Sequence, residues 1–105
     1  VDVVPTGAGD GPVVRTELFP AYPNPFNPAT TIRYALASRQ HVRIDIFSVT
    51  GARVATLVDE PRPGGVQRVT WDGRDARGVP AASGVYLIRM TTAERNFVRK
   101  AILLK

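Results

Sequence analysis

The chain has 105 residues, and its 44% hydrophobic and 22% charged residues are ordinary for one globular domain rather than for a disordered segment. It carries a formal net charge of +5, contains no cysteine and has one histidine, which excludes disulfides, cysteine-ligated metals and histidine-rich metal sites. No stretch is long and apolar enough for a transmembrane helix. These limits favour a binding, anchoring or structural module over a cofactor enzyme, and we expect no cofactor.

Residues 1–16 are rich in glycine and proline, a composition typical of a flexible linker. The chain starts at Val1 with neither a methionine nor a leader-like segment, so we expect it to be part of a longer protein. We expect the folded domain to comprise residues 17–105.

Prolines at short intervals dominate the next segment, residues 20–29, which we call the strap. Each proline fixes φ and lacks an N–H donor, so neither a helix nor a central strand can form here. We expect an extended, turn-rich segment that Tyr22 and Phe26 pin to a core. The side chains of Asn24 and Asn27 are expected to cap its turns.

Short runs with period-two alternation follow the strap, which is the pattern of half-buried antiparallel strands. Strands are predicted at residues 32–36, 42–46, 53–58, 66–71, 85–91 and 97–104. Six or seven short strands at this spacing, without a convincing helix, predict an all-β fold, an antiparallel β-sandwich. The side chains expected to fill its core are Tyr34, Ile44, Ile46, Leu57, Val69, Trp71, Tyr86, Ile88 and Phe97.

The loop at residues 71–80 holds the strongest candidates for metal chemistry, Asp72 and Asp75. Closely spaced carboxylates beside glycine could bind calcium, but the spacing differs from Asp-x-Asp-x-Asp-Gly and no bidentate glutamate follows. We expect a turn in which both aspartates accept backbone N–H bonds, and no metal site. Asp45 is expected to point outward on its strand and to pair with Arg43.

Other functional classes find little support. The chain has no dinucleotide-binding glycine motif, phosphate loop or nucleophile elbow, so we expect no enzymatic activity. The pI of about 10.4 would suit a polyanion, but the basic residues are scattered and form no run, so we expect no nucleic-acid partner. Aromatic residues could form a sugar-binding platform, but most of them fall on predicted inner faces.

Four pieces of sequence, in fixed order and spacing, carry a resemblance to a known family. They are YPNPFNPATTIRYAL from Tyr22, VRIDIFSVTGARVATLV from Val42, VTWDGRDARG from Val69, and ASGVYLIRM followed by a closing RKAILLK. Together they resemble the C-terminal sorting domain of the bacterial type IX secretion system. The WDGRD and SGVY pieces are shared with the immunoglobulin-like domain of flagellar hook-capping proteins.

The resemblance implies an immunoglobulin-like sandwich of about seven strands that serves as a non-catalytic address signal at the C-terminus of a secreted protein. The partners it implies are the outer-membrane translocon and sortase of type IX secretion, an N-terminal cargo domain and anionic lipopolysaccharide. It also implies a location at the cell surface or outside the cell, reached through the periplasm. The residues carried over for recognition by the translocon are Tyr22, Pro23, Asn24, Pro25, Gly84, Tyr86, Lys100 and Lys105.

A hairpin at the chain end offers an edge strand, and a partner can recognise such an edge by strand addition. The end at Lys105, directly after an apolar strand, is what we expect of a natural C-terminus. Two alternatives stay open: an assembly domain of the hook-capping type, and a carbohydrate-binding accessory module. An upstream hydrolase or adhesin would favour sorting, an upstream helical partner would favour assembly, and an exposed planar row of aromatics would favour sugar binding.

Overall fold

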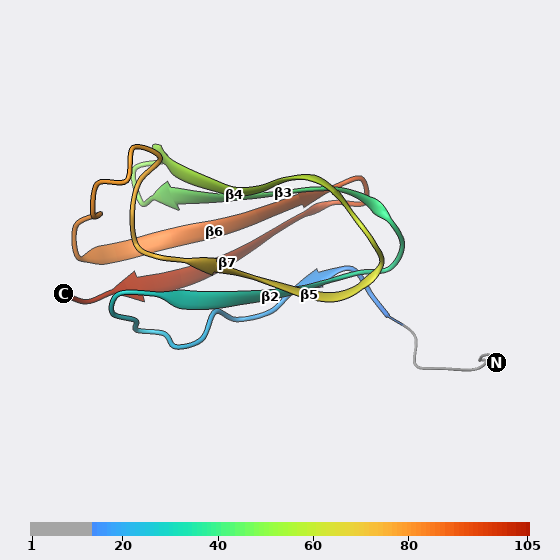
Figure 1. Ribbon diagram of the computed structural model, residues 1–105, viewed down its shortest axis with the longest axis horizontal. Helices are drawn as coiled ribbons and strands as arrows, with labels where there is room; N and C mark the ends of the chain where they lie inside the picture. Colours follow the sequence, from blue (N-terminus) through green and yellow to red (C-terminus); the bar gives the residue numbers. More distant parts are fainter. Residues whose placement is uncertain (1–13) are drawn as a thin grey trace.

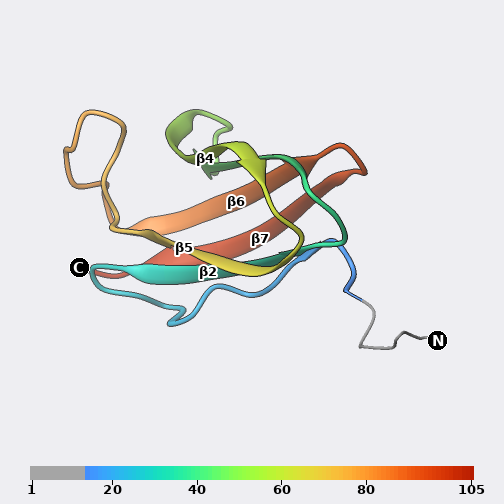
Figure 2. The same ribbon diagram turned by 45° about the vertical axis from the view of Figure 1, so that its right-hand side comes forward.

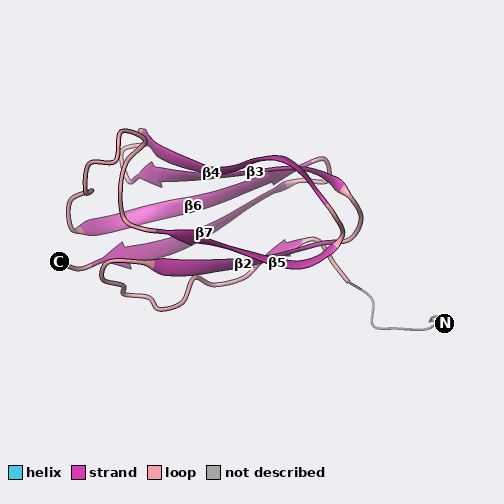
Figure 3. Cartoon of the chain, in the orientation of Figure 1, coloured by secondary structure: helices cyan, strands magenta, loops and turns pink. Residues whose placement is uncertain are grey.

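Two antiparallel sheets packed face to face make up the computed structural model, which describes residues 14–105 (Figures 1 and 2). The smaller sheet has the strand order β1-β2-β5, and the larger has the order β4-β3-β6-β7. The strands are β1 (Glu17–Leu18), β2 (Thr30–Leu36), β3 (Gln40–Ser48), β4 (Arg53–Arg62), β5 (Gly65–Trp71), β6 (Gly84–Thr92) and β7 (Asn96–Leu103). The structure therefore confirms the predicted all-β sandwich, with seven strands and no helix in its described part (Figure 3).

The described part of the chain contains no helix that could cross a membrane. Most of the expected linker, residues 1–13, lies outside the described residues. Thr16 at its end is buried: its hydroxyl donates to Glu94 and accepts the N–H of Ala37 at 2.8 Å. This contact joins the start of the described chain to the turn between β6 and β7.

The core lies between the sheets, where alternate residues of each strand meet. Trp71, at the end of β5, is fully buried, with its ring centroid 5.4 Å from that of Phe26 and 5.1 Å from that of Tyr86. Its indole Nε1 donates to the carbonyl of Arg74 at 3.0 Å. Among the predicted core residues, the buried ones are Tyr34, Ile44, Ile46, Trp71, Tyr86 and Ile88. Those packed against the core and partly buried are Leu57, Val69 and Phe97.

Asp45 departs from its predicted exposure. It lies between the inward-facing Ile44 and Ile46 on β3, yet its side chain is fully buried. The predicted ion pair with Arg43 is present, with Nε 2.9 Å from Oδ2, and Arg53 lies 3.7 Å from Oδ1. Period-two alternation correctly assigns the Asp45 side chain to the outer face of the sheet. It cannot show that long neighbouring side chains cover the carboxylate on that face.

Candidate functional site

The strap lies along the edge of β7, the last strand of the larger sheet. Phe26 donates its N–H to the carbonyl of Ile102 at 2.9 Å and accepts the N–H of Leu104 at 3.0 Å. The Asn24 side chain donates to the carbonyl of Lys100 and accepts the N–H of Ile102, both at 2.9 Å. These four bonds occupy the C-terminal half of the β7 edge. The expectation that this edge is open to strand addition is therefore wrong for that half.

The strap carries one buried and one exposed aromatic residue. Phe26 is 2% exposed and contacts Trp71, as expected. Tyr22 is 80% exposed, so its predicted role in the core is wrong. The backbone of Tyr22 pairs with that of Thr31, which directs its side chain outward because Thr30 and Ile32 on either side of Thr31 face the core. Of the two aromatic residues, only Phe26 anchors the strap to the core.

The two strap asparagines do not cap turns as predicted. Asn24 bonds to β7, and Asn27 finds no side-chain hydrogen-bond partner among residues 14–105. The turn is held instead by Thr30, whose hydroxyl donates to the carbonyl of Pro23 at 2.7 Å. Asparagine spacing alone could not distinguish a local cap from a bond to a strand more than seventy residues away.

Five of the eight recognition candidates lie together on one surface. We define the strap surface as the exposed residues Tyr22, Pro23, Asn24, Pro25 and Lys100. It combines an exposed aromatic ring with prolines, and such side chains lose little conformational freedom on binding. Its ring, prolines and lysine offer apolar and cationic contacts to a partner.

The other three candidates lie outside the strap surface, in the first part of β6 and just after β7. Gly84 opens β6 opposite Leu103 with a φ of 153°, a conformation that favours glycine. Tyr86 is 8% exposed, and its hydroxyl donates to the carbonyl of Ala82 at 2.6 Å while its ring packs on Trp71. Lys105 donates its N–H to the hydroxyl of Ser83 at 3.0 Å. Tyr86 thus contributes to the core rather than to an accessible surface.

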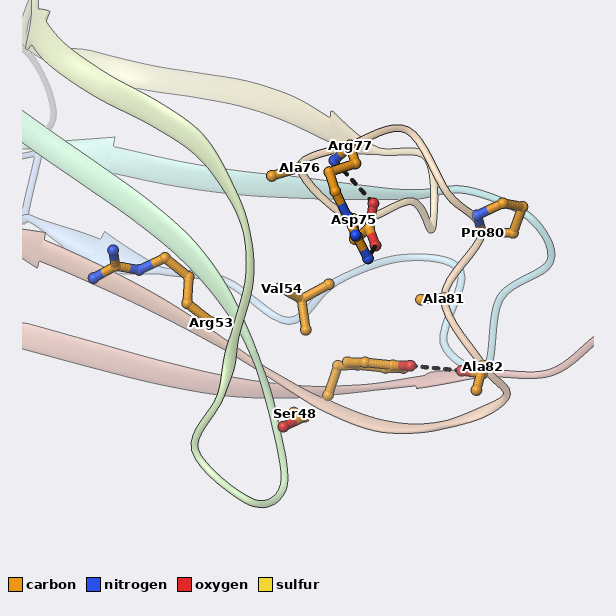
Figure 4. Close-up of a pocket in the computed structure, with 10 residues that line it drawn as sticks. Ser48, Arg53, Val54, Asp75, Ala76, Arg77, Pro80, Ala81 and Ala82 are labelled. Carbon is orange, nitrogen blue, oxygen red and sulfur yellow. Dashed lines mark hydrogen bonds and ion pairs between the residues drawn. The ribbon is translucent and has the colours of Figure 1, made fainter.

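The loop at residues 71–80 borders an open pocket of about 610 Å³ (Figure 4). Asp75 and Arg77 lie together on one side of this pocket, and the Tyr86 hydroxyl bonds to Ala82 on the other. Asp75 Oδ1 accepts the N–H groups of Arg77 at 2.9 Å and Val79 at 3.0 Å. The carboxylates therefore make the turn bonds predicted for them.

Asp72 makes the same kind of bond, because its Oδ1 accepts the N–H of Arg74 at 3.1 Å. Within residues 14–105 no three histidine or acidic side chains gather where they could hold a metal ion. A calcium ion at Asp72 and Asp75 would therefore find no third acidic side chain among these residues. One oxygen of each aspartate already accepts a backbone N–H. This geometry suits a structural turn better than an ion that takes six to eight oxygen ligands.

The pKa of Asp75 is expected to lie below its ordinary value of 3.8. The hydrogen bond from Val79 is the main cause, and the N–H and charge of Arg77 act in the same direction. Because folding depresses this pKa, the charged carboxylate stabilises the fold above the ordinary pKa and loses that contribution as pH falls through the folded value. Titration followed by carboxyl-carbon NMR should show Asp75 ionising below 3.8. Ionisation at or above that value would contradict the turn geometry.

Asn24→Ala should lower the free energy of unfolding by about 1–2 kcal/mol, because it removes two hydrogen bonds between the strap and β7. Hydrogen exchange at the N–H of Ile102 should accelerate, since that group loses its acceptor. Asn27→Ala is the matched control and should change stability by less than about 0.5 kcal/mol. Equal effects of the two substitutions in urea unfolding would show that the Asn24 bonds do not fasten the strap.

Solved structures with the same fold include PorU and PorZ of Porphyromonas gingivalis, the second described as an essential bacterial surface component of the type IX secretion system. Both are 22% identical to this chain, with TM-scores of 0.69 and 0.58 over 91% and 86% of it. The chain covers only 10% of the PorU chain and 11% of the PorZ chain.

No curated protein matches the sequence. The family model described as the FlgD Ig-like domain matches residues 27–96, which is more than half of the chain. The match begins within the strap and runs through the first residue of β7, so it includes most of the sandwich. The chain therefore belongs to the FlgD Ig-like domain family.

Proposed function

We propose that this immunoglobulin-like domain is a C-terminal sorting domain: a non-catalytic signal that the type IX translocon recognises in order to carry an attached N-terminal cargo across the outer membrane. The observation that carries the proposal is the strap surface. Tyr22, the prolines beside it and Lys100 are exposed, and the strap is held on β7 by bonds from Asn24 and Phe26. A recognition surface needs this combination of accessibility and fixed shape.

The likeness to segments of PorU and PorZ supports the proposal, because it shows that the same fold occurs as a small part of longer proteins. A sortase and anionic lipopolysaccharide are proposed as later partners on the sequence resemblance. The charge of +5 is compatible with an anionic envelope, although surface charge affects the rate of encounter more than affinity. The proposed destination is the cell surface or the medium, reached through the periplasm.

The family match favours a second candidate, an assembly domain like that of hook-capping proteins. Such a domain would serve by holding its neighbours in a polymer or cap rather than by directing export. The exposed strap surface is compatible with both functions, so export must be measured directly.

A fluorescent cargo fused ahead of residues 1–105 should reach the surface of a host with a working type IX system. The cargo alone, and the same fusion in a strain without the translocon, should remain in the periplasm. Surface labelling and fractionation measure the distribution. Retention of the fusion in the competent host would exclude the sorting function and favour the assembly domain.

A further inference from the structure

The outer face of the larger sheet carries a second exposed feature, at the centre of strands β3, β6 and β7. Phe47 pairs with Leu87, which pairs in turn with Lys100, and in the next row Arg89 pairs with Val98. Their neighbours Ile88 and Ala101 are fully buried in the core, so these five side chains share the opposite face. We define the outer patch as Phe47, Leu87, Arg89, Val98 and Lys100.

The outer patch is hollowed rather than flat. Phe47, Leu87, Arg89 and Val98, with Gly51 of the β3–β4 turn, line a pocket of about 280 Å³. The Arg89 guanidinium lies over the Phe47 ring, 4.6 Å from its centroid, and Val98 is 57% exposed. A pocket with aliphatic and aromatic walls offers a place for one apolar side chain of a partner.

The charges around the pocket have one sign. Arg89 and Lys100 belong to the outer patch, and the Arg53 guanidinium lies 5.9 Å from the Phe47 ring centroid. The carboxylate opposite Arg89 in the sheet is that of Asp45, which is fully buried and ion-paired with Arg43 and Arg53. The patch itself thus presents cations beside an apolar pocket, and its electrostatic complement is an acidic group next to an apolar side chain.

We propose that the outer patch binds an acidic segment of a protein partner, which inserts an apolar side chain into the pocket between Phe47, Leu87 and Val98. That this partner is a component of the translocon rests on the proposed function. A second copy of the chain fits poorly, because two such patches face to face would oppose cations with cations. A lipid surface has no side chain of fixed position to fill the hollow, so charge and shape together favour a protein.

Lys100 connects this patch with the strap surface. Its carbonyl accepts a bond from Asn24, while its side chain lies in the row of Phe47 and Leu87 on the sheet face. A partner bound at the outer patch would therefore lie directly beside the strap, and both surfaces can contribute to one interface.

Two matched valines allow a sharp test in the cargo fusion of residues 1–105. Val98 in the outer patch is 57% exposed, and Val66 on β5 of the other sheet is 61% exposed. A benzoyl-phenylalanine photo-crosslinker is placed at either position in the competent host. Cross-linking from position 98 to an outer-membrane translocon protein should exceed that from position 66 at least about tenfold, and the cross-linked segment should contain acidic residues.

The substitutions Val98→Asp and Val66→Asp supply the second readout. Val98→Asp should lower export at least about tenfold, because it removes an apolar wall and repels an acidic partner, whereas Val66→Asp should leave export close to that of the parent fusion. Melting temperatures of the purified chains should agree between the two variants, which separates recognition from folding. Lys100→Glu, with Arg68→Glu on the other sheet as control, should repeat the contrast.

The outcomes separate the two proposals. Retention of the parent fusion counts against sorting, and in that case preferential cross-linking from position 98 to another acidic protein still supports the outer patch. Normal export of Val98→Asp with equal cross-linking from both positions overturns the outer patch alone. Two further results would overturn the proposal. If the chain self-associates in sedimentation and Val98→Asp abolishes this, the patch binds a second copy. If the chain binds phosphatidylglycerol vesicles and Val98→Asp abolishes this, the patch binds lipid.

Discussion

Replacing Trp71 with alanine should lower the free energy of unfolding by about 3–5 kcal/mol, one of the two largest effects expected in this domain. The indole is fully buried and contacts the rings of Phe26 and Tyr86, so its removal leaves a cavity among residues from both sheets and the strap. Its Nε1 also satisfies the carbonyl of Arg74, which joins the 71–80 loop to the core. Urea unfolding followed by circular dichroism measures the loss.

Val66→Ala on the same strand is the matched control. Val66 is 61% exposed, so its truncation should change stability by no more than about 0.5 kcal/mol. A loss below about 1 kcal/mol for Trp71→Ala would show that the indole is not the centre of the core. That result would instead favour a position of Trp71 at the surface, as the sugar-binding alternative requires.

Deleting residues 101–105 should abolish the compact fold, which is the other large effect. Ala101 and Leu103 are almost fully buried, and loss of a buried leucine side chain alone costs about 2–5 kcal/mol. The deletion also removes Ile102 and Leu104, which hold Phe26 through backbone bonds. The strap and the end of β7 are therefore lost together, and the total approaches the whole stability of a typical small domain, about 5–15 kcal/mol.

Limited proteolysis and thermal unfolding measure the effect of the deletion. The shortened chain should be cut rapidly and show no cooperative transition. Lys105→Ala should unfold like the parent chain, because the exposed Lys105 side chain contributes at most about 1 kcal/mol. A shortened chain that resists proteolysis as well as the parent would contradict the role assigned to the end of β7.

Local sequence pattern was sufficient to predict six of the seven strands and part of the core; it missed β1 and several buried residues, such as Leu36 and Met90. Alternation along residues 42–46 placed Ile44 and Ile46 inside, and four closely spaced prolines correctly excluded a helix from the strap. Contacts between segments that are far apart in the chain have no comparable signal in the local sequence. The bonds from Asn24 to Lys100 and Ile102 join residues more than seventy positions apart, so the covered β7 edge could not be predicted.

The candidate site was predicted in part for the same reason. Alternation assigns a side chain to a face only within a strand, and Tyr22 lies in an irregular segment where its pairing with Thr31 decides its direction. Asp45 was assigned to the correct face, but its burial depends on the reach of Arg43 and Arg53. The grouping of Lys100 with the strap likewise became visible only once the sheets were assembled, whereas the predicted core position of Tyr86 is confirmed.

The central claim is that the translocon recognises the strap surface, and Tyr22→Ser in the cargo fusion tests it most directly. Tyr22 is 80% exposed, so the substitution should leave the melting temperature unchanged while lowering surface export at least about tenfold. Val66→Ser, which alters an exposed apolar residue of β5 away from the strap, should be exported like the parent fusion. Export of the Tyr22→Ser fusion at the parent level, with the fold intact, would contradict the claim.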